Sequence, residues 1–130
     1  MRLGMIGLGR MGGSMVERLI LGGHELVVYD VNINAVEYRQ SQGATGTASI
    51  KELVDNLTSP KIIWIMLPQG KPTDEVIDEL IPYLDSGDIL IDGGNANYKD
   101  TQIRSEKLAA YDSNLIDVGV SGGVWGLSDG

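Results

Sequence analysis

The sequence predicts a doubly wound α/β domain, in which helices cover both faces of a parallel sheet. Five apolar runs of strand length alternate with segments whose apolar residues recur at helical spacing. Strands separated in this way cannot be joined by hairpins, so right-handed crossovers place them parallel in one sheet. The chain of 130 residues is long enough for one such domain with a buried core.

The predicted strands are short, and each is followed by Gly, Asp or Pro. They span residues 3–6, 26–29, 62–67, 89–91 and 115–118. Continuous apolar runs of this kind are typical of strands that are buried on both faces.

The predicted helices lie between these runs. Helical spacing of apolar residues covers 11–20, 35–39, 76–84 and 103–111. The segment Ser49-Ile50-Lys51-Glu52 is a capping box, in which the Ser hydroxyl and the Glu carboxylate satisfy reciprocal backbone donors at a helix start. Gly43, Gly46 and Gly87 are expected to mark helix ends.

Composition excludes several classes of site and partner. The chain has no Cys, and His24 is its only His, so it has neither a thiolate nor a multi-histidine metal centre. The net charge of −8, without a basic block, disfavours nucleic acid. The longest apolar run, 62–67, is far shorter than the roughly 20 residues that span a bilayer. We therefore expect no membrane partner and, without a signal-peptide pattern, a cytoplasmic location.

A glycine motif indicates a dinucleotide site. Gly7-Leu8-Gly9-Arg10-Met11-Gly12 has the form G-x-G-x-x-G and lies directly between the first predicted strand and the first helix. Gly7 permits a tight turn, Gly9 lets the backbone approach a diphosphate, and Gly12 lets the helix lie close to the strand. The alternative is a chance turn in a glycine-rich chain. We expect residues 7–12 to bind the cofactor diphosphate.

An acidic residue at the end of the second strand indicates which dinucleotide is bound. Asp30 follows the glycine loop by roughly the 20 residues expected of the acid that accepts hydrogen bonds from the adenosine ribose. A carboxylate there repels the 2′-phosphate of NADP, and Val31 and Asn32 offer no positive charge to offset that repulsion. We therefore expect NAD rather than NADP, although Arg10 is in reach of the adenosine side. The alternative is that Asp30 only caps the strand end.

Further candidate residues follow the later strands, because ligands of doubly wound sheets bind outside the carboxyl ends of the strands. They are Leu67, Pro68 and Gln69, then Asn95, and finally Ser121, Gly122 and Gly123. Turn formation explains such residues without any ligand. The functional interpretation is that Asn95 and Ser121, beside glycine amides, meet a polar substrate next to the nicotinamide.

These motifs resemble the β-hydroxyacid dehydrogenases. The glycine loop, Met66-Leu67-Pro68 and Val120-Ser121-Gly122-Gly123 carry the general likeness. Residues 91–101, Ile-Asp-Gly-Gly-Asn-Ala-Asn-Tyr-Lys-Asp-Thr, are similar to the I-D-G-G-N-x-x-Y-x-D-T stretch of 6-phosphogluconate dehydrogenases, where the 3-hydroxyisobutyrate type tends to carry Asp-x-Ser-Thr. NADP-using members usually read Asn-Arg-Ser/Thr where this chain has Asp30-Val31-Asn32, so the resemblance implies the NAD-preferring branch. Val124-Trp125 departs from the acidic residue that many members have there.

The resemblance implies roles for the candidate residues. Leu67, Pro68 and Gln69 would lie along the dinucleotide. Asn95 would touch both the nicotinamide side and the substrate. The three residues of the last loop would bind 6-phosphogluconate. These three residues are Ser121, Gly122 and Gly123.

The resemblance also implies what the chain lacks. Residues 1–130 would be the cofactor domain of a longer, homo-oligomeric enzyme of the pentose phosphate pathway, which oxidises and decarboxylates 6-phosphogluconate to ribulose 5-phosphate. The Lys and Glu that serve as base and acid would lie in the missing helical part, so we expect no catalytic residue and no turnover in this chain. Two alternatives stay open: another β-hydroxyacid dehydrogenase of the 3-hydroxyisobutyrate type, and a non-catalytic dinucleotide-binding module.

Overall fold

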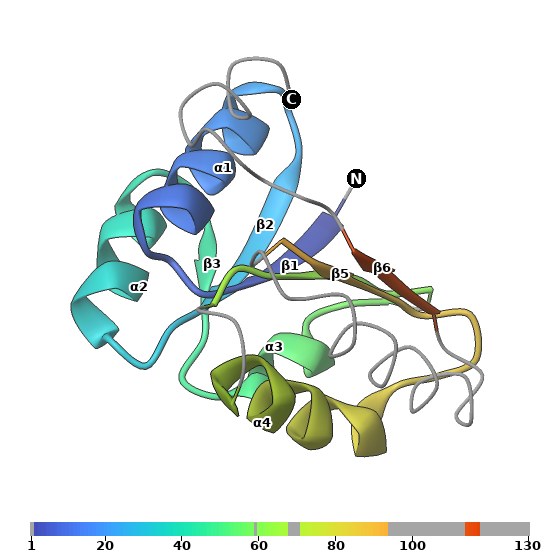
Figure 1. The fold of residues 1–130 in the computed structure, drawn as a ribbon. Helices are drawn as coiled ribbons and strands as arrows, with labels where there is room; N and C mark the ends of the chain where they lie inside the picture. Colours follow the sequence, from blue (N-terminus) through green and yellow to red (C-terminus); the bar gives the residue numbers. More distant parts are fainter. Residues whose placement is uncertain (1, 59, 68–70, 94–113, 118–130) are drawn as a thin grey trace.

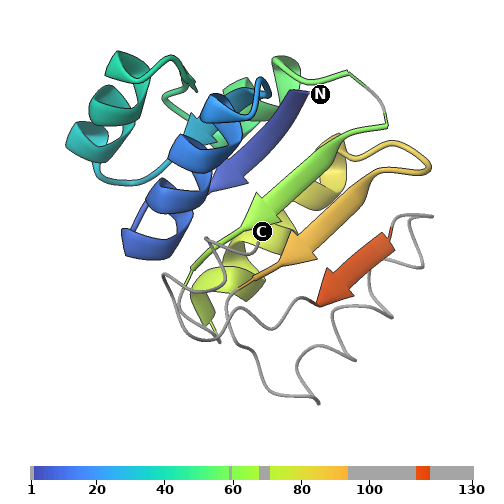
Figure 2. The ribbon, with the colours of Figure 1, turned by 90° about the horizontal axis from the view of Figure 1, so that it is seen from above.

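The structure, a computed structural model, describes residues 2–58, 60–67, 71–93 and 114–117. These residues form one parallel sheet in the order β3-β2-β1-β4-β5-β6. The strands are β1 (Arg2–Ile6), β2 (Glu25–Tyr29), β3 (Thr45–Gly46), β4 (Ile62–Ile65), β5 (Ile89–Asp92) and β6 (Asn114–Asp117). All strands point toward the same edge of the sheet, as Figure 2 shows. The predicted doubly wound fold is therefore confirmed.

The described helices cover both faces of the sheet. They are α1 (Arg10–Leu21), α2 (Ile33–Ser41), α3 (Ile50–Asp55), α4 (Lys71–Leu80) and the short 3₁₀ helix η1 (Ile81–Tyr83). Helices α1 and α2 lie on one face, and α3 and α4 lie on the other (Figure 1). None of the described helices is long and apolar enough to cross a membrane. The predicted helix at 103–111 lies outside the described residues.

The core consists of two clusters, one on each face of the sheet. Met5, Val16 and Val28 belong to the cluster under α1 and α2, whereas Ile6 and Val27 belong to the cluster under α3 and α4. Adjacent residues of β1 and β2 thus point to opposite faces, and both faces are buried, as predicted for these strands.

Strand β4 differs from this expectation. Ile63 and Ile65 are fully buried on the α3–α4 face, whereas Ile62 and Trp64 on the other face are only partly buried. The strand also ends at Ile65 rather than at residue 67, although the Met66 N–H still bonds the carbonyl of Ile6, the last residue of the neighbouring β1.

Two further predictions need correction. Gly46 does not end a helix but lies in β3, a two-residue strand that pairs with β2 through Val27 and Val28. The helix predicted over 76–84 changes at Ile81 into a 3₁₀ turn, because Pro82 has no N–H for an α-helical bond.

The capping box at Ser49 forms with one difference. The Glu52 N–H donates to Ser49 Oγ at 3.1 Å, as predicted. The Glu52 carboxylate, however, accepts a bond from the N–H of Ala48 at 3.3 Å, one residue before the expected donor. The helix start is therefore correct, and only the second bond is shifted.

Candidate functional site

The candidate site lies where the strand order reverses. The chain leaves β1 for β2 and β3 on one side, and then crosses to β4 on the other side of β1. In doubly wound sheets, ligands bind at such a reversal, outside the carboxyl ends of the strands. The glycine loop follows β1, and Met66 and Leu67 follow β4, so both loops line this edge.

The glycine loop packs against its neighbours so tightly that side chains are excluded. Gly7 has a φ of +98°, and a Cβ placed on it would lie 2.5 Å from the carbonyl oxygen of Met66. A Cβ on Gly12 would lie 2.0 Å from the carbonyl oxygen of Gly7. Both distances are far below van der Waals contact. The first and third glycines of the motif therefore permit the turn and the close approach of α1 to β1.

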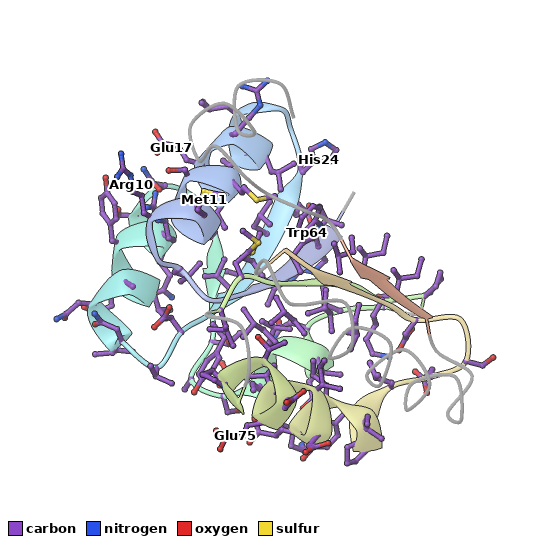
Figure 3. All side chains as sticks on the ribbon, viewed as in Figure 1. Arg10, Met11, Glu17, His24, Trp64 and Glu75 are labelled. Carbon is purple, nitrogen blue, oxygen red and sulfur yellow. The ribbon has the colours of Figure 1, made fainter. Side chains whose placement is uncertain are left out.

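The second glycine presents open backbone. Gly9 is the N-cap of α1, is exposed, and would have nothing within 4 Å of an added Cβ. It has no side chain with which to cap the helix, and the first turn of α1 contains no acidic residue. The N-terminal amides and the positive end of the helix dipole are therefore free to meet an anion. Arg10 and Met11, labelled in Figure 3, begin this helix, and Arg10 is exposed.

Asp30 lies directly beside this loop. Its Oδ2 accepts the N–H of Leu8 at 2.7 Å, and its Oδ1 accepts the N–H of Asn32 at 2.8 Å. A carboxylate offers about four acceptor positions, so roughly two remain for hydroxyl groups of a ligand. Asp30 thus lies next to the glycine loop, as its spacing from the loop predicts, and its carboxylate also bonds the loop itself.

The two residues after Asp30 differ in how they are used. Val31 is 91% exposed, and it leaves an uncharged surface next to the carboxylate. Asn32 is the N-cap of α2, where its Oδ1 accepts the N–H of Asn34 at 3.0 Å. The oxygen of its side chain is therefore already engaged in the fold, although Asn32 remains next to the site.

The remaining candidates divide by where they lie. Leu67 is partly buried against the core, with its Cδ2 3.0 Å from the Cβ position of Gly7. Pro68, Gln69, Asn95, Ser121, Gly122 and Gly123 lie outside the described residues. The backbone of Met66 forms one wall of the glycine turn and was not among the predicted site residues. The available signal for it in the sequence is the requirement for glycine at both positions 7 and 12.

The described residues present no metal centre and no histidine at this edge. Among them, no group of three or more His, Asp or Glu side chains is placed to hold a metal ion. His24 lies between α1 and β2, with its N–H bonded to the carbonyl of Leu19, at the opposite end of α1 from Arg10 (Figure 3). Backbone amides, one carboxylate and an exposed apolar position thus make up the described part of the site, a set that fits a dinucleotide.

Known proteins are similar to this chain in sequence and in fold. The family described as the NAD binding domain of 6-phosphogluconate dehydrogenase matches residues 2–130. An NAD(+)-dependent, decarboxylating 6-phosphogluconate dehydrogenase of Haloferax volcanii is 42% identical over 130 residues, which are 100% of this chain and 42% of that protein. A decarboxylating 6-phosphogluconate dehydrogenase of Staphylococcus aureus is 40% identical and covers 99% of this chain and 28% of its own length.

Solved structures agree on the fold. A 6-phosphogluconate dehydrogenase of Plasmodium falciparum superposes with a TM-score of 0.89 at 28% identity, over 98% of this chain and 28% of that one. A 3-hydroxyisobutyrate dehydrogenase of Mycobacterium tuberculosis reaches a TM-score of 0.87, over 95% of this chain and 42% of that one, but at 22% identity it supports the fold alone. This chain spans less than half the length of these relatives. On the match over residues 2–130, it belongs to the family of NAD binding domains of 6-phosphogluconate dehydrogenase.

Proposed function

We propose that this chain is the cofactor domain of an NAD-preferring, decarboxylating 6-phosphogluconate dehydrogenase, and that residues 1–130 form one dinucleotide-binding unit. The supporting observation is the juxtaposition of uncapped helix amides at Gly9 with the Asp30 carboxylate, which bonds the same loop. The amides bind the diphosphate, and the remaining acceptor positions of Asp30 bind the adenosine ribose hydroxyls.

Cofactor choice follows from charge at the same place. A 2′-phosphate would come close to the Asp30 carboxylate, and at about 4 Å with an effective dielectric near 20 each pair of unit charges repels by roughly 4 kcal/mol. Asp30 is partly exposed, so solvent reduces this repulsion. Val31, which is exposed and uncharged, provides no compensating cation. NAD is therefore preferred to NADP.

Replacement of Asp30 tests this preference. In Asp30→Ala, we expect the ratio of the NADP and NAD dissociation constants, measured by isothermal titration calorimetry, to fall by about 10- to 30-fold, because both the ribose acceptor and the repelling charge are removed. Glu25→Ala is the matched control, since it removes an acid from the exposed start of the same strand. An unchanged ratio in Asp30→Ala would place the origin of the selectivity elsewhere.

The substrate side of the proposal rests on the relatives. We propose that Asn95, Ser121, Gly122 and Gly123 contact 6-phosphogluconate next to the nicotinamide, with Pro68 and Gln69 along the dinucleotide. When bound, NAD would accept the hydride from the substrate carbon that carries the oxidised hydroxyl, and that hydroxyl would give its proton to a base. We propose that this chain positions the cofactor and excludes a 2′-phosphate, and that none of its residues is the acid or the base of the reaction. A homo-oligomer and a cytoplasmic location stay predictions.

A kinetic measurement tests this division of labour. We expect the 130-residue chain to bind NAD and yet to give no 6-phosphogluconate-dependent NADH formation, because a hydroxyl proton has no base to receive it. NADH formation is measured by its absorbance, with the 130-residue chain in large excess over any contaminating dehydrogenase. NADH formation that disappears in Gly9→Ala would show that the chain supplies its own base.

A further inference from the structure

The Asp30 carboxylate has partners within the protein that have nothing to do with ribose. Leu8 is buried, with an exposed fraction of 5%, and its N–H points to Asp30 Oδ2 at 2.7 Å from a position 22 residues earlier in the chain. A buried amide without a partner is unfavourable, and a bond to a charged acceptor is stronger than one to a neutral acceptor. This bond therefore fixes the amide of Leu8 in the fold.

The position of Leu8 makes the bond important for the site. Leu8 stands between Gly7 and Gly9, the two residues that form the turn and present the open backbone. Glycine has more backbone freedom than any other residue, so a loop with two glycines needs anchors to keep one shape. Two successive amides provide them: the Gly7 N–H bonds the carbonyl of Tyr29 at 3.0 Å, and the Leu8 N–H bonds Asp30.

We propose that Asp30 is also a positioning residue, whose carboxylate holds the glycine loop in the shape that receives the diphosphate. This inference rests on the proposed dinucleotide function. Part of the contribution of Asp30 to binding then passes through the loop and not through the ribose hydroxyls. An Asn at this position has only one acceptor oxygen and no charge, so it cannot accept from both Leu8 and Asn32, and any bond to Leu8 that it keeps is the weaker, neutral kind.

A ligand without ribose hydroxyls separates the two roles. The probe is an NAD analogue whose adenosine ribose lacks both the 2′- and the 3′-hydroxyl. If Asp30 acted on ribose alone, Asp30→Asn would leave the affinity for this analogue unchanged, or would raise it by removing a negative charge near the diphosphate. If Asp30 holds the loop, the same substitution lowers the affinity for the analogue by about tenfold.

The experiment compares NAD and the analogue on the wild-type chain, on Asp30→Asn and on Glu25→Gln, by calorimetry. Glu25→Gln carries the same change of charge at the other end of β2, where Glu25 bonds only the exposed Arg2 in the described structure, and it should bind both ligands like the wild type. Equal affinity of the wild type and Asp30→Asn for the analogue, with NAD binding intact in the wild type, overturns the inference alone. Absence of NAD binding in the wild type overturns the proposed function.

A second measurement covers the case that Asp30→Asn does not fold. In the ligand-free wild type, hydrogen exchange followed by NMR should show the Leu8 amide protected, whereas the amide of Arg10, the first residue of α1, lacks an intrahelical partner and should exchange rapidly. Exchange of Leu8 as fast as that of Arg10 would show that the carboxylate does not hold the loop, and would overturn the inference.

Discussion

Gly12→Ala should lose both dinucleotide binding and a large part of its folding stability. The new Cβ would lie 2.0 Å from the carbonyl oxygen of Gly7 and 3.2 Å from Cβ of Met66. The first neighbour is backbone in a turn that is itself in contact with Met66, so the clash is relieved only if α1 and the loop separate. Overpacking of this kind costs about 1–3 kcal/mol or more in the free energy of unfolding. We expect NAD affinity to fall on the order of 100-fold, since the loop changes shape.

Gly9→Ala is the matched control, because the same methyl group meets open space. Nothing lies within 4 Å of a Cβ on Gly9, and its φ of −65° is accessible to alanine. The expected change in unfolding free energy is below about 1 kcal/mol, the size of an N-cap effect. NAD binding should still weaken, because the methyl group stands where the diphosphate approaches. Denaturant unfolding and calorimetry on both variants check the contrast, and equal losses of stability would contradict the steric explanation.

Local patterns were sufficient for the parts of the fold that bury continuous apolar runs. Strands β1 and β2 lie inside the sheet with both faces covered, so the residues after their charged first positions, 3–6 and 26–29, form apolar runs and were predicted correctly. Strand β3 was missed because Thr45 and Gly46 form no apolar run. It exists because its backbone pairs with the edge of β2, and because the next residue, the buried Thr47, donates its Oγ1 hydrogen to the carbonyl of Val28 at 2.8 Å.

The same limit applies to the site. Spacing alone placed Asp30 near the glycine loop, because a strand, a turn and a helix of ordinary length return the chain to that edge. The register of β1 against β2, in which Ile6 lies opposite Tyr29, decides which atoms of the glycine loop meet the Asp30 carboxylate. The bond from Leu8 to Asp30 depends on that register and left no pattern in the sequence. The wall that Met66 forms depends on the pairing of β1 with β4, and its only trace in the sequence is the glycine at positions 7 and 12.

A buried ion cluster at the opposite edge of the sheet was also invisible in the sequence. Lys61 is 5% exposed, and its Nζ lies 2.7 Å from Asp85 Oδ2 and 2.8 Å from Asp88 Oδ2. Asp88, with no exposed surface, also accepts the N–H of Lys61 at 2.7 Å and the N–H of Asp85 at 2.7 Å. Lys61 and Asp88 are 27 residues apart and meet only because β4 and β5 pair. The cluster therefore ties together the starts of these two strands.

Lys61→Met should destabilise the domain by about 3–5 kcal/mol, because it leaves the buried Asp88 carboxylate without its cation. Lys51→Met is the matched control: Lys51 pairs with Asp55 on the exposed surface of α3, and its loss should cost about 0.5 kcal/mol or less. Denaturant unfolding measures both values. Adding Asp88→Asn to Lys61→Met should recover part of the loss, since the unpaired charge is then removed. Equal stability of the two lysine variants would mean that the buried pair contributes nothing beyond a surface pair.

Alkaline pH provides an independent test of the same cluster. Burial by itself lowers the pKa of Lys61, but the hydrogen bonds and the attraction of Asp85 and Asp88 outweigh it and raise the pKa above the ordinary value of 10.5. Because the folded state holds this proton more tightly than the unfolded state, the stabilisation is complete below about pH 10.5 and is lost as pH rises through the raised pKa. Wild type and Lys51→Met should therefore lose stability together in that range, whereas Lys61→Met should lose less. An identical alkaline slope in all three would show that the Lys61 proton is not linked to folding.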